Sequence, residues 1–150
     1  MDLSNDDVPD SMNTVLFVCL HGSAKSLIAA THLSQLAESR ALPWRGESSG
    51  TEPDTDVPEP VIKGLATDGI DVRGYQPRTL TDEQMHGAAR IVSFGCDLVP
   101  PPSSSVTVER WDDLPLVSDG YGTARAAIVA RVTRLLDQLQ EQQNRELEVS

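Results

Sequence analysis

The sequence predicts an α/β fold whose strands form a parallel sheet. Short apolar runs alternate along the chain with segments of helical spacing, which is the pattern of strands joined by crossover helices. The first run, Val15 to Val18, is apolar at every position, as in a strand buried on both faces of a parallel sheet. Such sheets bind ligands at the carboxyl ends of their strands, so a functional site is expected where these strands end.

Four strands and four helices are expected. The first helix carries His32 on its flank, which we expect to be solvated or to cap the helix. Thr81 is the expected N-cap of the third helix. The last helix has one apolar face, which we interpret as a packing face. In order, the expected elements are strands over 14–19, 44–49, 90–94 and 106–111, and helices over 26–40, 61–66, 81–88 and 123–143.

Length and composition indicate one domain. The chain has 150 residues, of which 39% are hydrophobic, and we expect a folded domain over 13–143 between a disordered acidic tail (1–12) and a short tail (144–150). The formal net charge of −11 argues against binding to nucleic acid or to an anionic membrane. No apolar run is long enough to span a membrane, and the acidic N-terminus is unlike a signal peptide.

The two cysteines, Cys19 and Cys96, are far apart in sequence and do not form a disulfide framework. The expected compartment is therefore the reducing cytoplasm.

The stretch from Thr14 to Ser26 is the most informative part of the chain. A strand ends at Cys19, six small or polar residues follow, and a helix opens at Ser26. This arrangement directs backbone N–H groups and a positive helix end to one place, which favours a thiolate at Cys19 and binding of an oxyanion. The alternative is a small buried cysteine with no chemical role. A Walker-type phosphate loop is excluded, because Ala24 and Cys19 stand where its two glycines would fall.

These residues resemble the low-molecular-weight protein tyrosine phosphatases and, more closely, their arsenate reductase branch. The family has the loop C-x5-R-S after its first strand, and here Cys19 is followed by five residues and Lys25-Ser26. The segments 69–71 (GID), 77–83 (PRTLTDE) and Gly95-Cys96 also resemble the arsenate reductases. The resemblance covers roughly residues 14–140. It implies a three-layer α/β/α fold with a four-stranded parallel sheet.

The resemblance also implies roles for the loop residues. Cys19 would attack phosphorus or arsenic and form a covalent intermediate, and the Ser26 hydroxyl would stabilise its thiolate. His21 matches the histidine of the C-x-H-N form of the arsenate reductases, and the alternative is a loop-tip side chain without a role. The expected oxyanion-binding loop consists of Leu20, His21, Gly22, Ser23, Ala24 and Lys25.

Two departures from the family pattern indicate attenuated activity. Lys25 stands where the family has arginine, and a lysine offers a point charge instead of a planar two-pronged donor. The loss of one charge-assisted hydrogen bond costs roughly 1.5–3 kcal/mol, or about 10- to 100-fold in rate. Gly22 replaces an asparagine; it tolerates the same left-handed backbone but lacks the side-chain hydrogen bonds.

The general acid is a third departure. The family carries an Asp-Pro before the last helix, and two alignments are open here. Segment 111–116 (WDDLPL) resembles the reductases' W-x-L-P-D-P and places Leu116 at the acid. Segment 119–121 (DGY) resembles the phosphatases' D-P-[YF] and places Asp119 there, which we prefer because an aromatic residue follows. Asp112 and Asp113 are interpreted as turn and strand-end residues.

Cys96 matches one of the further cysteines of thioredoxin-coupled arsenate reductases, but no second one follows it between Asp97 and Thr107. It is a possible redox residue, and the alternative is a buried structural cysteine. An arsenate reductase built on this chain would require an external thiol.

We therefore expect an enzyme in which Cys19, Lys25, Ser26 and Asp119 act slowly on a phosphomonoester or arsenate. The alternative is an oxyanion-binding or regulatory relative that has lost turnover. No metal and no cofactor are expected. The expected partner is a small oxyanion or phosphorylated substrate, and the sequence indicates no particular protein partner.

Overall fold

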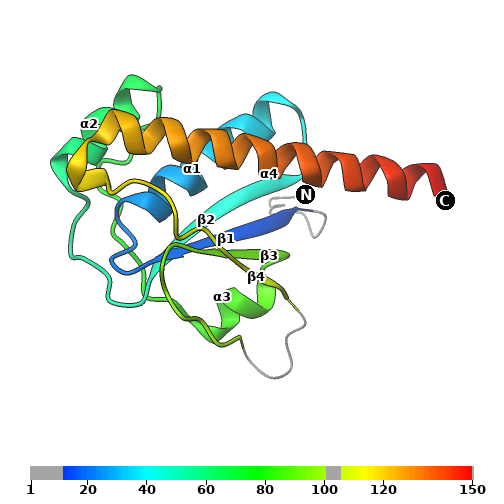
Figure 1. Cartoon of the computed structure of the whole chain (residues 1–150), viewed down its shortest axis with the longest axis horizontal. Coiled ribbons are helices and arrows are strands. Elements are labelled where there is room, and N and C mark those ends of the chain that lie inside the picture. The colour runs from blue at the N-terminus through cyan, green and yellow to red at the C-terminus, as the bar shows by residue number, and fades with distance from the viewer. Residues whose placement is uncertain (1–11, 101–105, 150) are drawn as a thin grey trace, which may run out of the picture.

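The computed structural model describes residues 12–100 and 106–149. Four parallel strands form one sheet in the order β2-β1-β3-β4, with helices packed on both sides (Figure 1). The predicted α/β fold with a four-stranded parallel sheet is confirmed. The elements are β1 (Asn13–Cys19), α1 (Lys25–Ser39), β2 (Trp44–Gly50), α2 (Glu59–Thr67), α3 (Asp82–Gly87), β3 (Arg90–Ser93), β4 (Val108–Arg110), η1 (Val117–Asp119) and α4 (Tyr121–Val149).

The central strand β1 separates two hydrophobic cores. Val15 and Phe17 point to one face of the sheet, and Leu16 and Val18 point to the other; all four are fully buried. This accounts for a run that is apolar at every position, because alternate side chains of a strand point to opposite faces. The larger core is formed with α1, α2 and α4, and the smaller one lies against α3.

The helix α3 begins with the predicted cap. The Thr81 side chain accepts a hydrogen bond from the Gln84 backbone N–H (3.1 Å), and the Gln84 side chain accepts one from the Thr81 N–H (3.0 Å). This reciprocal capping box satisfies two N–H groups at the helix start. Met85, on the next turn, is buried in the smaller core.

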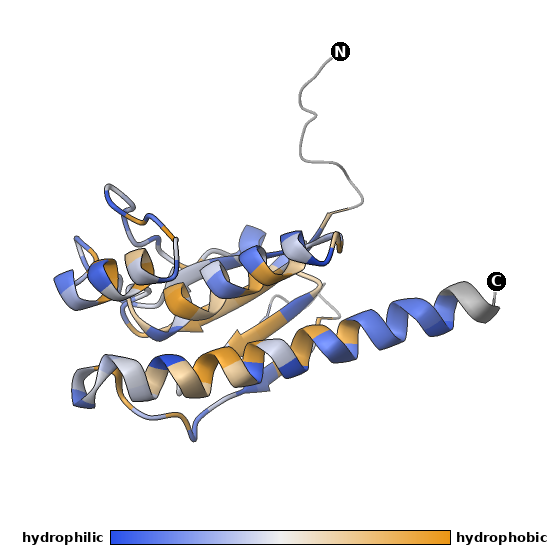
Figure 2. Cartoon of the chain, turned by 90° about the horizontal axis from the view of Figure 1, so that it is seen from above, coloured by the Kyte–Doolittle hydropathy of each residue, from blue (hydrophilic) through white to orange (hydrophobic). Residues whose placement is uncertain are grey.

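The last helix is longer than the sequence predicts. It begins at Tyr121 instead of Thr123 and continues to Val149 instead of ending at Gln143. Figure 2 shows that the hydrophobic residues of this helix lie in its first part, and that the hydrophilic remainder projects beyond the sheet. Among the described residues, no helix is both long and apolar enough to cross a lipid bilayer. The predicted acidic tail lies, apart from Met12, outside the described residues.

The expectation for His32 is wrong. Its side chain is buried between α1 and its neighbours, 3.3 Å from a carboxylate oxygen of Asp68. Asp68 in turn accepts two hydrogen bonds of 2.7 Å from Arg125 on α4. Spacing along one helix does not reveal that another element covers the position.

Candidate active site

The loop that follows β1 is shaped by two glycines. β1 ends at Cys19, and α1 begins at Lys25. Between them Gly22 adopts a φ of +63°, which L side chains rarely adopt. The end of β2 packs directly on this point, because Gly50 pairs with Cys19 and its backbone touches that of Gly22. We call residues 20–25 the anion loop.

The carbonyl groups of Cys19, Leu20 and His21 point to the segment after β2. The backbone N–H groups of residues 51, 52 and 54 donate to the carbonyl oxygens of residues 19, 20 and 21, at 3.3, 2.7 and 3.0 Å. In a trans peptide the N–H of the next residue points the opposite way, and the chain has no cis peptide among its described residues. The N–H groups of residues 20–22 therefore face the inside of the loop, which suits an anion.

The sulfur of Cys19 lies at the floor of this loop and is held by two groups. It accepts a hydrogen bond from the Gly22 N–H (3.2 Å) and lies 3.0 Å from the Ser26 hydroxyl. The Ser26 hydroxyl is also 2.7 Å from that of Ser48, which reaches the Gly22 carbonyl at 3.3 Å. A thiolate can only accept, so Ser26 then donates to the sulfur, and Ser48 donates its single proton to Ser26 instead of to the Gly22 carbonyl.

Two positive groups stand at the head of α1. The N-cap residue Ala24 makes no side-chain capping hydrogen bond, so the helix end presents unsatisfied N–H groups and a partial positive charge. The Lys25 ammonium lies beside it and donates one hydrogen bond, to the Leu114 carbonyl (3.3 Å). An ammonium has three donors, so Lys25 keeps two for an anion.

The anion loop opens into a cleft of about 480 Å³. Cys19 and Lys25 both line this cleft, and most of the other residues that line it are apolar. The residues that line the cleft are Cys19, Leu20, His21, Ser23, Ala24, Lys25, Asp54, Pro58, Pro60, Val61, Phe94, Leu116, Val117 and Ser118. A site of this form binds the charged group of a ligand at the floor and an apolar group along the walls.

The predicted general acid does not line the cleft. Asp119 is exposed at the end of the short helix η1, whereas Leu116, Val117 and Ser118 of the same segment do line it. The structure thus brings Cys19, Lys25 and Ser26 together and leaves Asp119 outside. The role of Asp119 stays a prediction.

His21 lines the cleft and is held by the segment after β2. Its ring Nδ1 is 3.1 Å from the Glu52 carbonyl oxygen and 3.4 Å from a carboxylate oxygen of Asp54. The other oxygen of Asp54 accepts a hydrogen bond from Ser23 (2.7 Å). Asp54 thus braces two residues of the anion loop.

Cys96 is half-buried and does not line the cleft. Burial raises the pKa of its thiol, although a hydrogen bond with Thr51 opposes this shift. Both cysteines are free. A raised pKa leaves less thiolate near neutral pH, which makes Cys96 a poorer nucleophile than an exposed thiol.

Several residues of the site were missed in the sequence. Ser48 and Gly50 end the second strand, and Asp54 follows it. From the serine, glycine and threonine residues after residue 47, the sequence predicts only the end of a strand. Their place at the carboxyl end of a strand beside β1 was the available signal, because parallel strands bring their carboxyl ends to one edge.

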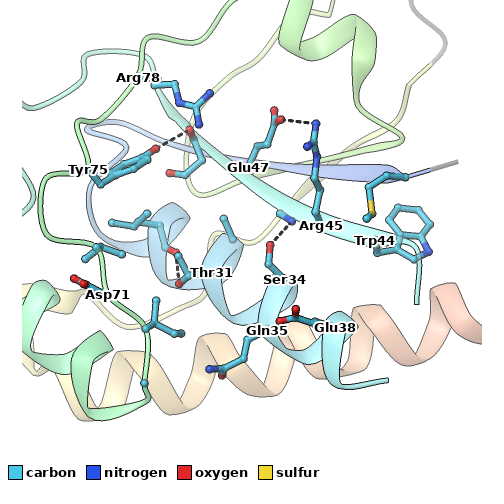
Figure 3. A pocket seen from close by; sticks show the side chains of 18 of the residues that line it. Thr31, Ser34, Gln35, Glu38, Trp44, Arg45, Glu47, Asp71, Tyr75 and Arg78 are labelled. Atoms are coloured by element: carbon cyan, nitrogen blue, oxygen red, sulfur yellow. Dashed lines mark hydrogen bonds and ion pairs between the residues drawn. The ribbon is translucent and has the colours of Figure 1, made fainter. Parts of the chain in front are cut away.

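A larger groove of about 1020 Å³ lies elsewhere, between α1, β2 and segment 69–78 (Figure 3). None of the predicted site residues lines it. The free edge of β2 is covered there by side chains: Ser34 accepts from the Gly46 N–H (2.8 Å), and Tyr75 donates to the Ser48 carbonyl (3.4 Å). Within the described ranges, no group of three or more His, Cys, Asp or Glu residues could hold a metal ion.

Comparisons with known proteins identify relatives with the same fold. An arsenate reductase structure from Archaeoglobus fulgidus is 28% identical, with a TM-score of 0.65, and the match covers 82% of this chain and 98% of that one. A low molecular weight phosphotyrosine phosphatase from Vibrio cholerae O395 has a TM-score of 0.75 at 17% identity, over 87% and 98%.

The thioredoxin-dependent arsenate reductase of Corynebacterium glutamicum has a TM-score of 0.71 at 23% identity. The match covers 87% of this chain but only 63% of that protein. The sequence model described as low molecular weight phosphotyrosine protein phosphatase matches residues 14–95, which is more than half of the chain. The chain therefore belongs to the low molecular weight phosphotyrosine protein phosphatase family.

Proposed function

We propose that this protein hydrolyses phosphomonoesters slowly, with Cys19 as the nucleophile. The observation that carries the proposal is the position of the Cys19 sulfur. It lies at the floor of inward-facing N–H groups, in contact with the Ser26 hydroxyl and the Gly22 N–H. These donors stabilise a thiolate next to the place where an oxyanion binds.

In the proposed reaction the thiolate attacks phosphorus and the bond to the ester oxygen breaks. The leaving alcohol takes a proton, and a phosphocysteine remains. Water then attacks phosphorus, the bond to sulfur breaks, and inorganic phosphate and the thiolate are released. The loop N–H groups, the head of α1 and Lys25 balance the charge on the phosphoryl oxygens in both steps.

The walls of the cleft favour an ester over a bare oxyanion. Arsenate would occupy only the anion loop and leave the apolar wall residues in water. An ester with an apolar alcohol part would cover side chains such as Leu20, Val61 and Leu116. Burial of apolar surface contributes about 25 cal/mol per Å².

We propose attenuated activity because of Lys25. Its ammonium cannot form the planar pair of hydrogen bonds that an arginine makes to two phosphoryl oxygens. One of its donors is also engaged by the Leu114 carbonyl. The positive charge of Lys25 therefore favours binding of an anion more than it stabilises the transition state.

A second candidate is a thiol-dependent arsenate reductase, favoured by the 28% identity to the Archaeoglobus fulgidus enzyme. The proposed cycle on this chain would use Cys19 and an external thiol. No other cofactor enters either proposal.

The test compares wild type with Cys19→Ser on p-nitrophenyl phosphate and on arsenate with a thiol reductant. Hydrolysis that disappears in Cys19→Ser supports the phosphatase. Thiol oxidation that depends on arsenate and Cys19 supports the reductase instead. If neither reaction occurs but phosphate raises the melting temperature, the protein is an oxyanion-binding relative.

A further inference from the structure

We propose that His21 donates the proton to the leaving group, in place of an aspartic acid from the loop before α4. This inference rests on the proposed phosphatase activity and identifies a residue that acts in it. The residues that line the cleft support it. The segment before α4 contributes only Leu116, Val117 and Ser118, none of which is an acid near neutral pH.

The titratable side chains that line the cleft are Cys19, His21, Lys25 and Asp54. Cys19 is the nucleophile, and the positive charge of Lys25 is needed on the phosphoryl oxygens. The Asp54 carboxyl accepts a hydrogen bond from the Ser23 hydroxyl and lies against the His21 ring, so it is engaged in holding the loop. His21 is the remaining group, and an imidazole can act as both a general acid and a general base.

The ring of His21 is oriented for this role. The Glu52 carbonyl oxygen only accepts, so Nδ1 at 3.1 Å carries a hydrogen, and the Asp54 carboxylate lies 3.4 Å from the same atom. This fixes the tautomer in which the exchangeable proton of the protonated ring sits on Nε2. Among the described residues Nε2 has no protein partner. It faces away from segment 51–54, because the two ring nitrogens point apart.

The backbone of His21 is fixed as well. Its carbonyl oxygen accepts the Asp54 N–H at 3.0 Å, while the Glu52 N–H donates to the preceding carbonyl at 2.7 Å. Main chain and ring are thus both anchored to segment 52–54, although the side chain is 53% exposed. A loop-tip histidine without a role would not need this double attachment. The anchoring holds the imidazole in the lining of the cleft, and the proposal places the leaving group of a bound ester beside it.

His21 loses a proton in the first step of the reaction and regains one in the second. Protonated His21 gives the Nε2 proton to the ester oxygen as the phosphorus–oxygen bond breaks, and the alcohol leaves neutral. The neutral ring then accepts a proton from the water that attacks the phosphocysteine. Asp54 stabilises the imidazolium before the first step and again after the second. General acid catalysis of this kind contributes about 10²- to 10⁴-fold.

The test uses two esters with His21→Gln, Asp54→Asn and Asp119→Asn. Phenyl phosphate has a poor leaving group, and p-nitrophenyl phosphate has one that needs little protonation. We expect His21→Gln to lower kcat for phenyl phosphate about 100-fold and kcat for p-nitrophenyl phosphate less than about 5-fold. It should also remove the alkaline descending limb of the phenyl phosphate pH profile. Asp54→Asn should lower kcat in the same direction by a smaller factor, because the positioning of the ring weakens.

The matched control is His86→Gln, a change of the same type at an exposed site on α3 that does not line the cleft. Equal losses on both esters in His21→Gln, or no loss, would overturn the assignment of His21 and leave the phosphatase proposal standing. A selective loss on phenyl phosphate in Asp119→Asn alone would assign the proton to Asp119 instead. A wild type without any Cys19-dependent hydrolysis would overturn the phosphatase proposal, and the role of His21 with it.

Discussion

Gly22 and Gly50 meet backbone to backbone at the base of the anion loop, and neither position leaves room for a side chain. A Cβ on Gly22 would lie 2.8 Å from the Gly50 nitrogen, and a Cβ on Gly50 would lie 2.7 Å from the Gly22 nitrogen. Both contacts are with backbone, which cannot rotate away. The shape of the anion loop therefore depends on two glycines from different strand ends.

Gly50→Ala should disturb the anion loop. The new methyl group must displace the segment that carries Gly22, whose N–H donates to the Cys19 sulfur. We expect a loss of about 1–3 kcal/mol in the free energy of unfolding, as for other overpacked sites, and a larger fractional loss of activity. Urea unfolding and kcat/KM for p-nitrophenyl phosphate measure the two effects.

The control for this change is Gly122→Ala. Gly122 lies in the first turn of α4 with nothing within 4 Å of an added Cβ, and alanine favours helices. It should leave both quantities unchanged or raise stability slightly. Equal behaviour of the two variants would contradict the packing argument.

Ser48→Ala should lower activity more than stability. Two hydroxyl groups, those of Ser48 and Ser26, form a series of hydrogen bonds that ends at the Cys19 sulfur, and Ser48 is the one farther from the sulfur. Without it, Ser26 loses the donor that orients its own proton to the thiolate. A hydrogen bond of this kind is worth about 0.5–1.5 kcal/mol, so kcat should fall roughly 3- to 10-fold.

The neighbouring Ser49 provides a comparison in the same strand. Its hydroxyl points to the other side of the sheet and donates to Gln84 (2.9 Å). Ser49→Ala should therefore cost stability without slowing hydrolysis. If the two serine variants lose activity equally, the hydroxyl chain to Cys19 has no special role.

The sequence predicts β1 and the place of Cys19 well, because both depend on residues that are adjacent in the chain. The apolar run before Cys19 identifies a buried strand, and the spacing from Cys19 to Ser26 identifies the loop. The cap at Thr81 is likewise a local pattern, and the structure forms it. Patterns within one segment are enough for these features.

Features that depend on neighbours from distant segments could not be predicted in the same way. Asp54 touches Ser23 only because β2 lies beside β1, and Asp68 reaches His32 and Arg125 across three elements. The general acid is the clearest example. Residue order could align either Leu116 or Asp119 with the acid of the family, and only the cleft shows that Leu116 lines it and Asp119 does not.

Stability should fall as the pH drops below neutral because of His32. Burial lowers the pKa of His32 from 6.5, which outweighs the opposing effect of Asp68. The Asp68 carboxylate, 3.3 Å from the ring Nε2, opposes this shift without cancelling it. Since the unfolded chain binds a proton more readily than the folded one, the contribution of His32 is complete above pH 6.5. It is lost as the pH falls through the lowered pKa.

The measurement is urea unfolding of wild type and His32→Gln at several pH values between 8 and 5. The wild type should lose stability toward pH 5 more steeply than His32→Gln. Asp68 does not interfere in this range, because hydrogen bonds from Arg125 hold its pKa below 3.8, so its contribution is lost only at lower pH. A slope that His32→Gln leaves unchanged would show that other groups cause the dependence.

Lys25→Arg should raise activity, and its effect separates a slow enzyme from a binding protein. Arginine keeps the positive charge, so long-range attraction of an anion does not change. Its planar group has five donors, which can serve two phosphoryl oxygens and still reach the Leu114 carbonyl that Lys25 contacts now. Any gain must therefore come from geometry. We expect about a 10-fold or larger increase in kcat/KM for p-nitrophenyl phosphate, which corresponds to about 1.4 kcal/mol.

Lys63→Arg is the matched control, because Lys63 is the other lysine of the chain and is exposed on α2. It should leave kcat/KM unchanged. The ester used then distinguishes what else is missing in the site. If a proton donor such as His21 is in place, the gain in Lys25→Arg should extend to phenyl phosphate. If none is, the gain should be confined to p-nitrophenyl phosphate, whose leaving group needs little protonation. Should Lys25→Arg bind phosphate more tightly yet hydrolyse neither ester faster than wild type, the anion loop serves binding and not turnover.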